Sequence, residues 1–121
     1  MCPKESQKIL VVDDDADIRE VLQEVLVESG HEVMTASNGL EALQILRAGW
    51  SPCMVLLDLM MPVMDGYLFI AERRNDPYLA SIPVTVITAG RQVDVERLDG
   101  ATLVAKPIRL PALMSLIEQN C

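Results

Sequence analysis

The fold is decided by the stretch ILVVDDD (residues 9–15), in which four apolar residues run directly into three aspartates. An apolar run with no polar break is typical of a strand that is buried on both faces. The segment that follows, up to Gly30, carries apolar residues at helical spacing on one face and glutamates on another. Asp15 or Asp17 marks the start of this helix. The stretch therefore predicts a strand followed directly by a helix.

The same unit recurs along the rest of the chain. Further strands are predicted at residues 32–36, 54–57, 84–87 and 103–105. Helices are predicted from a cap at Asn38 to about Gly49, from Asp65-Gly66 to about Arg74, over a short segment at 93–98, and from about Pro111 to Gln119. Five such units predict an α/β fold, a doubly wound (βα)5 sandwich of three layers whose parallel sheet has right-handed crossovers.

Length and composition predict a single domain over residues 1–121, and half of the residues are hydrophobic, which excludes a disordered chain. The net charge of −8 argues against direct binding to nucleic acid or to an anionic membrane. Residues 1–7 form a polar N-terminal tail without the apolar region of a signal peptide. The three cysteines are far apart in the sequence, so we expect reduced thiols in a cytoplasmic protein.

Polar side chains that could bind a ligand or take part in a reaction follow four of the five predicted strands. The strand at 9–12 runs into Asp13 and Asp14, and the strand at 54–57 runs into Asp58. Thr88 and Lys106 follow the fourth and fifth strands, and the Lys106-Pro107 bond is a candidate cis peptide. Because ligands of open α/β sheets bind at the carboxyl ends of the strands, we expect these groups to converge.

The residue types in such a cluster limit the reactions that it could support. Carboxylates that lie close together repel one another, and a hard divalent cation such as Mg²⁺ removes that conflict. A lysine supplies a point charge for phosphoryl oxygens, and a threonine hydroxyl supplies a hydrogen bond. The residues therefore predict a phosphoryl-transfer site with an aspartate as the nucleophile.

At this point the sequence resembles the receiver domain of two-component response regulators. The matching stretches are ILVVDDD (9–15), VLLDLMMPVMDG (55–66), VTVITA (84–89) and AKP (105–107). The resemblance covers essentially the whole chain and implies a flavodoxin-like sheet with strand order 2-1-3-4-5. It also implies a signalling switch rather than an enzyme, with no chemistry beyond self-phosphotransfer and autodephosphorylation.

The resemblance assigns roles to individual residues. Asp58 would accept a phosphoryl group from the phosphohistidine of a histidine kinase or a histidine phosphotransfer protein, and the domain would then change its interactions with an unknown downstream protein. Asp14 would bind Mg²⁺, or alternatively Mn²⁺, directly, and Asp13 would act mainly through a water. The remaining roles fall to the backbone carbonyl of Met60 as a metal ligand, to Thr88, Ala89 and Lys106 around the phosphoryl group, and to Pro62, Asp65, Gly66 and Pro107 as structural residues.

Two departures from the family pattern concern the output surface. Receiver domains commonly carry an aromatic residue three positions before the lysine, where this chain has Leu103. The segment between Thr88 and Lys106 is also short, so we expect the fourth helix of the fold to be truncated or partly unwound.

Alternative functions remain open to different degrees. A pseudo-receiver that acts only as a docking module, with little phosphorylation-driven switching, is the main alternative because Leu103 is not aromatic. An aspartate-dependent phosphohydrolase would need an acid where the chain has Met60. A nucleotide-binding module would need a glycine-rich loop after the first strand, where the chain has aspartates. The domain could be a single-domain regulator or the receiver of a larger protein.

Overall fold

Strands and helices alternate along the chain in the computed structural model, which describes residues 8–89 and 93–120. The strands are β1 (Lys8–Val12), β2 (Glu32–Ala36), β3 (Met54–Leu57), β4 (Val84–Thr88) and β5 (Thr102–Ala105). The helices are α1 (Ala16–Glu28), α2 (Gly39–Arg47), α3 (Gly66–Arg74) and α4 (Leu110–Asn120), with a short 3₁₀ helix, η1 (Val95–Leu98), between β4 and β5. The predicted alternation is confirmed, with strand ends that differ by one residue.

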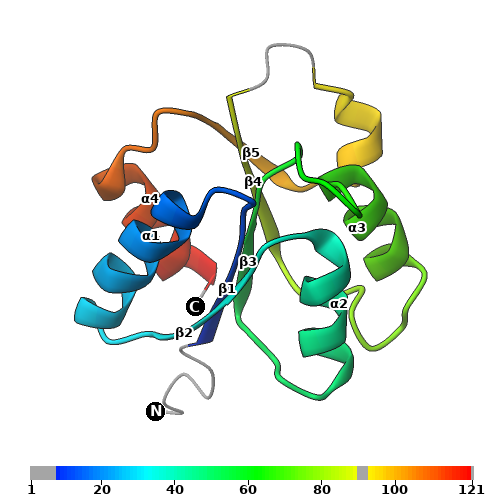
Figure 1. Cartoon of the computed structure of the whole chain (residues 1–121), viewed down its shortest axis with the longest axis horizontal. Helices are drawn as coiled ribbons and strands as arrows, with labels where there is room; N and C mark the ends of the chain where they lie inside the picture. The colour runs from blue at the N-terminus through cyan, green and yellow to red at the C-terminus, as the bar shows by residue number, and fades with distance from the viewer. Residues whose placement is uncertain (1–7, 90–92, 121) are drawn as a thin grey trace.

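The five strands form one parallel sheet in the order β2-β1-β3-β4-β5. Figure 1 shows this sheet between two layers, with α1 and α4 on one face and α2 and α3 on the other. The three-layer sandwich and the 2-1-3-4-5 order are therefore as predicted.

Each face of the sheet has its own apolar core, and β1 contributes to both. Leu10 and Val12 point to the face covered by α2 and α3, whereas Ile9 and Val11 point to the face covered by α1 and α4. All four side chains are at most 1% exposed. Burial on both faces explains why this strand reads as an unbroken apolar run.

Three helices begin at a polar residue that caps them. Asp15 accepts hydrogen bonds from the backbone of Asp17 and Ile18, so Asp15 rather than Asp17 is the cap of α1. Asn38 and Asp65 likewise cap α2 and α3 with their side chains. These caps satisfy N–H groups that have no partner inside the helix.

The expected truncation of the helix between β4 and β5 is confirmed for the described residues of that segment, where η1 forms one 3₁₀ turn. Tyr67 of α3 anchors this turn: its hydroxyl accepts a hydrogen bond from the N–H of Asp94 (2.9 Å), and the Arg97 guanidinium lies 4.4 Å from the centroid of its ring. One turn covers less of the sheet than a full helix does. Leu103 on β5 is accordingly 43% exposed.

Trp50, the only tryptophan in the sequence, lies in the loop between α2 and β3. Its side chain packs against the core under α2 and α3, and the Lys8 ammonium lies 5.9 Å from the ring centroid. Cys53 lies beside the start of β1, where its N–H donates to the carbonyl of Lys8 (2.8 Å).

The expectation of three reduced thiols was wrong for Cys53, which is disulfide-bonded. The other two cysteines and the predicted polar tail at 1–7 lie outside the described residues. Spacing along the chain did not reveal the bond, because it does not show which segments the fold brings together.

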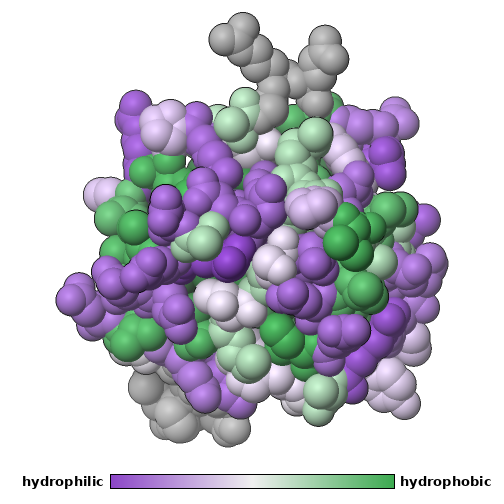
Figure 2. All heavy atoms as spheres, in the orientation of Figure 1, coloured by the Kyte–Doolittle hydropathy of each residue, from purple (hydrophilic) through white to green (hydrophobic). Residues whose placement is uncertain are grey.

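The surface has no single dominant apolar patch on the face shown in Figure 2, where hydrophobic areas alternate with hydrophilic ones. Within the described ranges, none of the helices combines the length and the apolar character that crossing a bilayer requires.

Candidate functional site

The register of the parallel strands brings the predicted polar residues to one edge of the sheet. Asp13 and Asp58 directly follow Val12 and Leu57, which are paired across β1 and β3. The N–H of Asp58 donates to the carbonyl of Val12 (2.9 Å), which fixes the two acids side by side. Two strands that end level thus place residues 45 positions apart at one point.

The register of β4 and β5 places the two other predicted side chains, Thr88 and Lys106, at the same edge. Thr88 ends β4, where it is paired with Ala105 of β5, and Lys106 is the next residue. The N–H of Lys106 donates to the carbonyl of Thr88 (2.9 Å). The Lys106-Pro107 peptide bond is cis, as predicted from the sequence.

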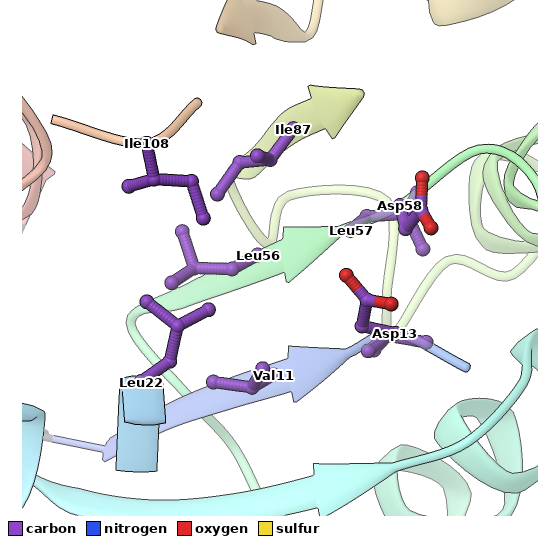
Figure 3. A pocket seen from close by; sticks show the side chains of 9 residues that line it. Val11, Asp13, Leu22, Leu56, Leu57, Asp58, Ile87 and Ile108 are labelled. Atoms are coloured by element: carbon purple, nitrogen blue, oxygen red, sulfur yellow. The ribbon is translucent and has the colours of Figure 1, made fainter. Parts of the chain in front are cut away.

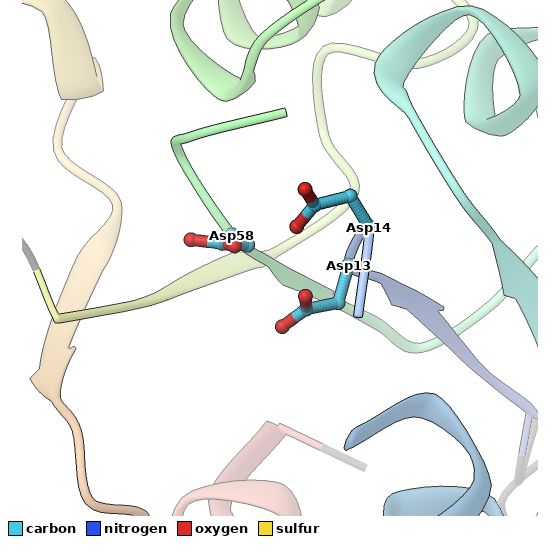
Figure 4. Close-up of side chains that lie close together, drawn as sticks. All are labelled: Asp13, Asp14 and Asp58. Atoms are coloured by element: carbon cyan, nitrogen blue, oxygen red, sulfur yellow. The ribbon is translucent and has the colours of Figure 1, made fainter. Parts of the chain in front are cut away.

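Three carboxylates meet at this edge. Asp13, Asp14 and Asp58 each offer an oxygen within 4.8 Å of the others. Asp13 and Asp58 are only 4% and 7% exposed, whereas Asp14 faces solvent. In Figure 4 the carboxylates of Asp13 and Asp14 extend from the end of β1 toward that of Asp58. One side of the cluster is thus open to water, and the other is buried.

One ammonium group faces the two buried acids. Nζ of Lys106 lies 3.3 Å from Oδ2 of Asp13 and 3.7 Å from Oδ2 of Asp58. The lysine side chain is itself only 19% exposed. Lys106 is the cation that forms ion pairs with these acids among the described residues, and its one positive charge does not balance the charge of three carboxylates.

The buried side of the cluster is aliphatic. Figure 3 shows Asp13 and Asp58 at one end of a narrow cavity whose other end is lined by Leu22, Leu56, Ile87 and Ile108. Its volume is about 10 Å³, room for about one water molecule. This wall removes solvent from the inner side of the acids.

Burial is the main reason why the pKa of Asp58 is raised above that of an ordinary aspartate. Repulsion from Asp13, and to a smaller extent from Asp14, raises this pKa further, whereas Lys106 and the N–H of Met60 oppose the rise. Keeping Asp58 ionised in the folded protein therefore costs free energy. A divalent cation among the three acids would remove that cost, and an all-oxygen donor set suits Mg²⁺.

Backbone contacts hold the acid-bearing loops in place. The N–H of Asp15 donates to Oδ1 of Asp13 (2.9 Å), and a guanidinium N–H of Arg19 donates to the backbone carbonyl of Asp13 (2.6 Å). Sequence reasoning did not single out Arg19. Its position in the first turns of the helix after the acids is the signal that could have pointed to it.

The loop after Asp58 contains the remaining predicted residues. Met60 is 69% exposed, and its N–H lies 3.4 Å from Oδ1 of Asp58. Gly66 is buried against the backbone of Asp58 and Leu59, where a Cβ would lie only 2.7 Å from the Asp58 carbonyl oxygen. Pro62 is exposed at this loop, Ala89 is exposed just after β4, and Pro107 is exposed after Lys106.

Comparison with known proteins identifies the family. Residues 9–118 match the family model of the response regulator receiver domain. The chain belongs to this family. Receiver domains are phosphoacceptor signalling domains of two-component systems, not classical enzymes, and their partners are histidine kinases.

Relatives of this receiver domain include regulators of transcription. The chain is 44% identical over 101 residues to "Probable transcriptional regulator ycf27" of Porphyra purpurea and 42% identical over 98 residues to "Transcriptional regulatory protein CpxR homolog" of Haemophilus influenzae. These matches cover 84% and 81% of this chain but only 40% of each relative. The chain thus spans about 40% of their length.

Solved receiver structures overlay closely on this one. Chemotaxis protein CheY4 of Vibrio cholerae has a TM-score of 0.84 at 28% identity, covering 96% of this chain and 99% of that chain. The receiver domain of sensor histidine kinase PA1611 of Pseudomonas aeruginosa has a TM-score of 0.84 at 26% identity, covering 95% and 97%. The PA1611 structure has a magnesium ion coordinated in its active site cleft.

Proposed function

We propose that Asp58 accepts a phosphoryl group from the phosphohistidine of a histidine kinase or a histidine phosphotransfer protein, and that this modification changes the proteins to which the domain binds. The observation that carries the proposal is the gathering of Asp13, Asp14 and Asp58 within 4.8 Å, with the Lys106 ammonium 3.3 and 3.7 Å from two of them. A buried carboxylate beside the Lys106 ammonium is suited to nucleophilic attack on phosphorus.

The proposed reaction is one displacement at phosphorus. An oxygen of the ionised Asp58 carboxylate attacks the phosphorus atom, and a new O–P bond forms as the N–P bond of the phosphohistidine breaks. The electron pair of that bond stays on the imidazole, which leaves as a neutral histidine when its other nitrogen carries a proton. The product on this chain is an aspartyl phosphate.

The other residues act on the charge of the transferred group. Lys106 and the hydroxyl of Thr88 would hold phosphoryl oxygens, and Ala89 would leave room beside them. Asp13, Asp14 and Asp58 with the Met60 carbonyl would hold Mg²⁺, or Mn²⁺ in its place. When bound, the ion supplies positive charge next to the phosphoryl oxygens. The fit rests on the all-oxygen donors and on the raised pKa of Asp58.

A docking module with little phosphorylation-driven switching is the second candidate function. Leu103 favours it, since this position on the partly exposed β5 lacks an aromatic ring that could change its packing. In either case we propose that residues 1–121 act as one receiver domain, either alone or as part of a longer regulator. Binding to nucleic acid is not proposed for this part, given its charge of −8.

Labelling with a small phosphodonor tests the proposal. Wild type, Asp58→Asn and the control Asp17→Asn are incubated with acetyl phosphate and Mg²⁺, and intact masses are measured. We expect one phosphoryl group on wild type and on the control, which alters only an exposed acid, and none on Asp58→Asn. Equal labelling of all three proteins would remove the assignment of Asp58.

Capture of a partner from a cell extract then separates the two functions. A switch predicts that the proteins retained by wild type change when beryllofluoride and Mg²⁺ are added. A docking module predicts the same retained proteins with and without beryllofluoride.

A further inference from the structure

The loop between β3 and α3 contains a strained turn. The N–H of Met64 donates to the carbonyl of Pro62 (2.7 Å), which closes a turn of three residues around Val63. Val63 has a φ of 68°, a left-handed conformation that is rare for a β-branched residue. Strained backbone of this kind persists only where surrounding contacts hold it, and it is concentrated at functional sites.

Gly39, the first residue of α2, supplies one such contact from outside the loop. Its N–H donates to the carbonyl of Met64 (2.9 Å). A Cβ on Gly39 would lie 2.8 Å from Cγ of Met64 and 3.0 Å from its carbonyl oxygen. Any side chain at this position must therefore displace Met64, whose side chain and carbonyl oxygen both lie too close to it.

The other end of the loop is held by α3. The N–H of Gly66 donates to the carbonyl of Leu59 (2.9 Å), and its missing side chain lets α3 pack against the backbone of Asp58. Met60, whose carbonyl is the proposed metal ligand, thus lies between two held points of the loop. Gly66 holds the loop at Leu59, and Gly39 holds it at Met64. No residue of α2 is among the proposed metal ligands or phosphoryl-binding residues.

We propose that Gly39 is a positioning residue for the phosphoacceptor site: its contact with Met64 holds the strained turn and thereby sets the place of the Met60 carbonyl. The inference rests on the proposed function, because it assigns Gly39 a role in metal binding and phosphorylation at Asp58. It goes beyond that function by linking the start of α2 to the site.

The variant Gly39→Ala tests the proposal, with Asn38→Ala as a matched control. The control removes the cap of the same helix, the bond from the Glu41 N–H to Asn38 Oδ1, but adds no atom next to Met64. We expect Gly39→Ala to weaken Mg²⁺ binding about tenfold, the usual effect of disturbing groups that orient metal ligands. Asn38→Ala should lower the Tm without a comparable loss of affinity. Equal Mg²⁺ affinities of the two variants would overturn the proposal.

Two further measurements separate positioning from general damage. Removing the Met64 side chain in the double variant Gly39→Ala/Met64→Ala should recover part of the lost affinity, because two of the three closest contacts involve that side chain. No recovery would contradict the proposed contact. In metal-free protein, the amides of residues 60–65 should exchange faster in Gly39→Ala than in Asn38→Ala, and this readout does not depend on phosphorylation at Asp58.

A measurement on the unaltered chain keeps the proposal testable should Gly39→Ala fail to fold. If the acid site and the start of α2 are coupled, occupancy of the site must protect the contact in return. Saturation with Mg²⁺ and beryllofluoride should slow exchange of the Gly39 amide about tenfold, within the usual range of coupling between sites. Unchanged exchange would refute the coupling, whereas failure of both probes to bind would instead refute the proposed function.

Discussion

The ammonium group of Lys106 lies 3.3 Å from the carboxylate of Asp13, a residue 93 positions earlier in the chain. The same ammonium is 3.7 Å from Asp58. In the absence of a phosphoryl group, the lysine thus partly compensates the two buried acids. The proposed transfer gives this cation a second partner, because phosphoryl oxygens on Asp58 would compete for it.

Replacing Lys106 should separate phosphorylation from metal binding. Lys106→Ala removes the cation that would face the phosphoryl oxygens, so we expect the initial rate of labelling by acetyl phosphate to fall about a hundredfold, comparable to the loss of one charge-stabilising donor. Mg²⁺ affinity should be retained or increased, since no ligand is lost and the acids become less compensated. Lys106→Arg is the control that keeps the charge. A collapse of Mg²⁺ binding in Lys106→Ala would show that the lysine has another role.

The raised pKa of Asp58 predicts how stability depends on pH. Protonation of this carboxyl favours the folded state, so its contribution is complete below the ordinary aspartate pKa and is lost as the pH rises through the raised value. In EDTA at pH 7, Asp58→Asn should therefore be more stable than wild type, by about 4 °C in Tm if about 1 kcal/mol is relieved. The difference should shrink toward pH 4. A lower Tm for Asp58→Asn at pH 7 would contradict this electrostatic account.

Magnesium should stabilise the folded chain by binding among the acids. At a free concentration about 100 times the Kd, one bound ion adds about 2.7 kcal/mol to the free energy of unfolding. Thermal melts in MgCl₂ should be compared with melts in NaCl of equal ionic strength, because salt alone weakens repulsion between the acids. The specific gain should disappear in Asp13→Asn. Identical Tm values in the two salts for wild type would exclude a magnesium site of this strength.

Arg73 should matter for stability, unlike its neighbour Arg74. The Arg73 guanidinium donates to the carbonyls of Ile82 and Ala80 (both 2.9 Å) and lies 3.8 Å from Asp99, and burial lowers its pKa. Arg73→Ala leaves these carbonyls without that donor, and we expect a loss of about 2 kcal/mol in urea unfolding.

The control for this prediction is Arg74→Ala. Arg74 lies 3.8 Å from the same Asp99, but its side chain is 64% exposed, so its removal should change the free energy of unfolding by less than about 0.5 kcal/mol. Equal losses in the two variants would show that the ion pair, not the carbonyl contacts, stabilises this region.

Much of the fold was predictable because the central strands β1, β3 and β4 are buried on both faces and therefore read as apolar runs. The acid cluster followed from the same argument: in a parallel sheet, residues that follow the strands, such as Asp13 and Asp58, must meet at one edge. The strand order came from the resemblance to receiver domains, since alternation alone does not determine which strands are neighbours.

Contacts between distant segments that the order of strands and helices does not determine were not predictable. Nothing in the sequence near Gly39 shows that the start of α2 touches the Met64 carbonyl. Arg19 could have been considered from its position, but its contact with the Asp13 carbonyl requires the helix direction to be known. The disulfide bond of Cys53 depends in the same way on which segments meet in space.

The placement of Trp50 determines how these experiments can be read. It lies beside Lys8 at the start of β1, whereas Asp13 follows the end of that strand, roughly 16 Å away at about 3.3 Å per residue. Because no other tryptophan is present, the tryptophan emission has a single source, which is remote from an ion bound at the acid cluster. Its emission should therefore report global unfolding without direct quenching at the acid cluster, so that one optical signal measures stability while mass or calorimetry measures occupancy.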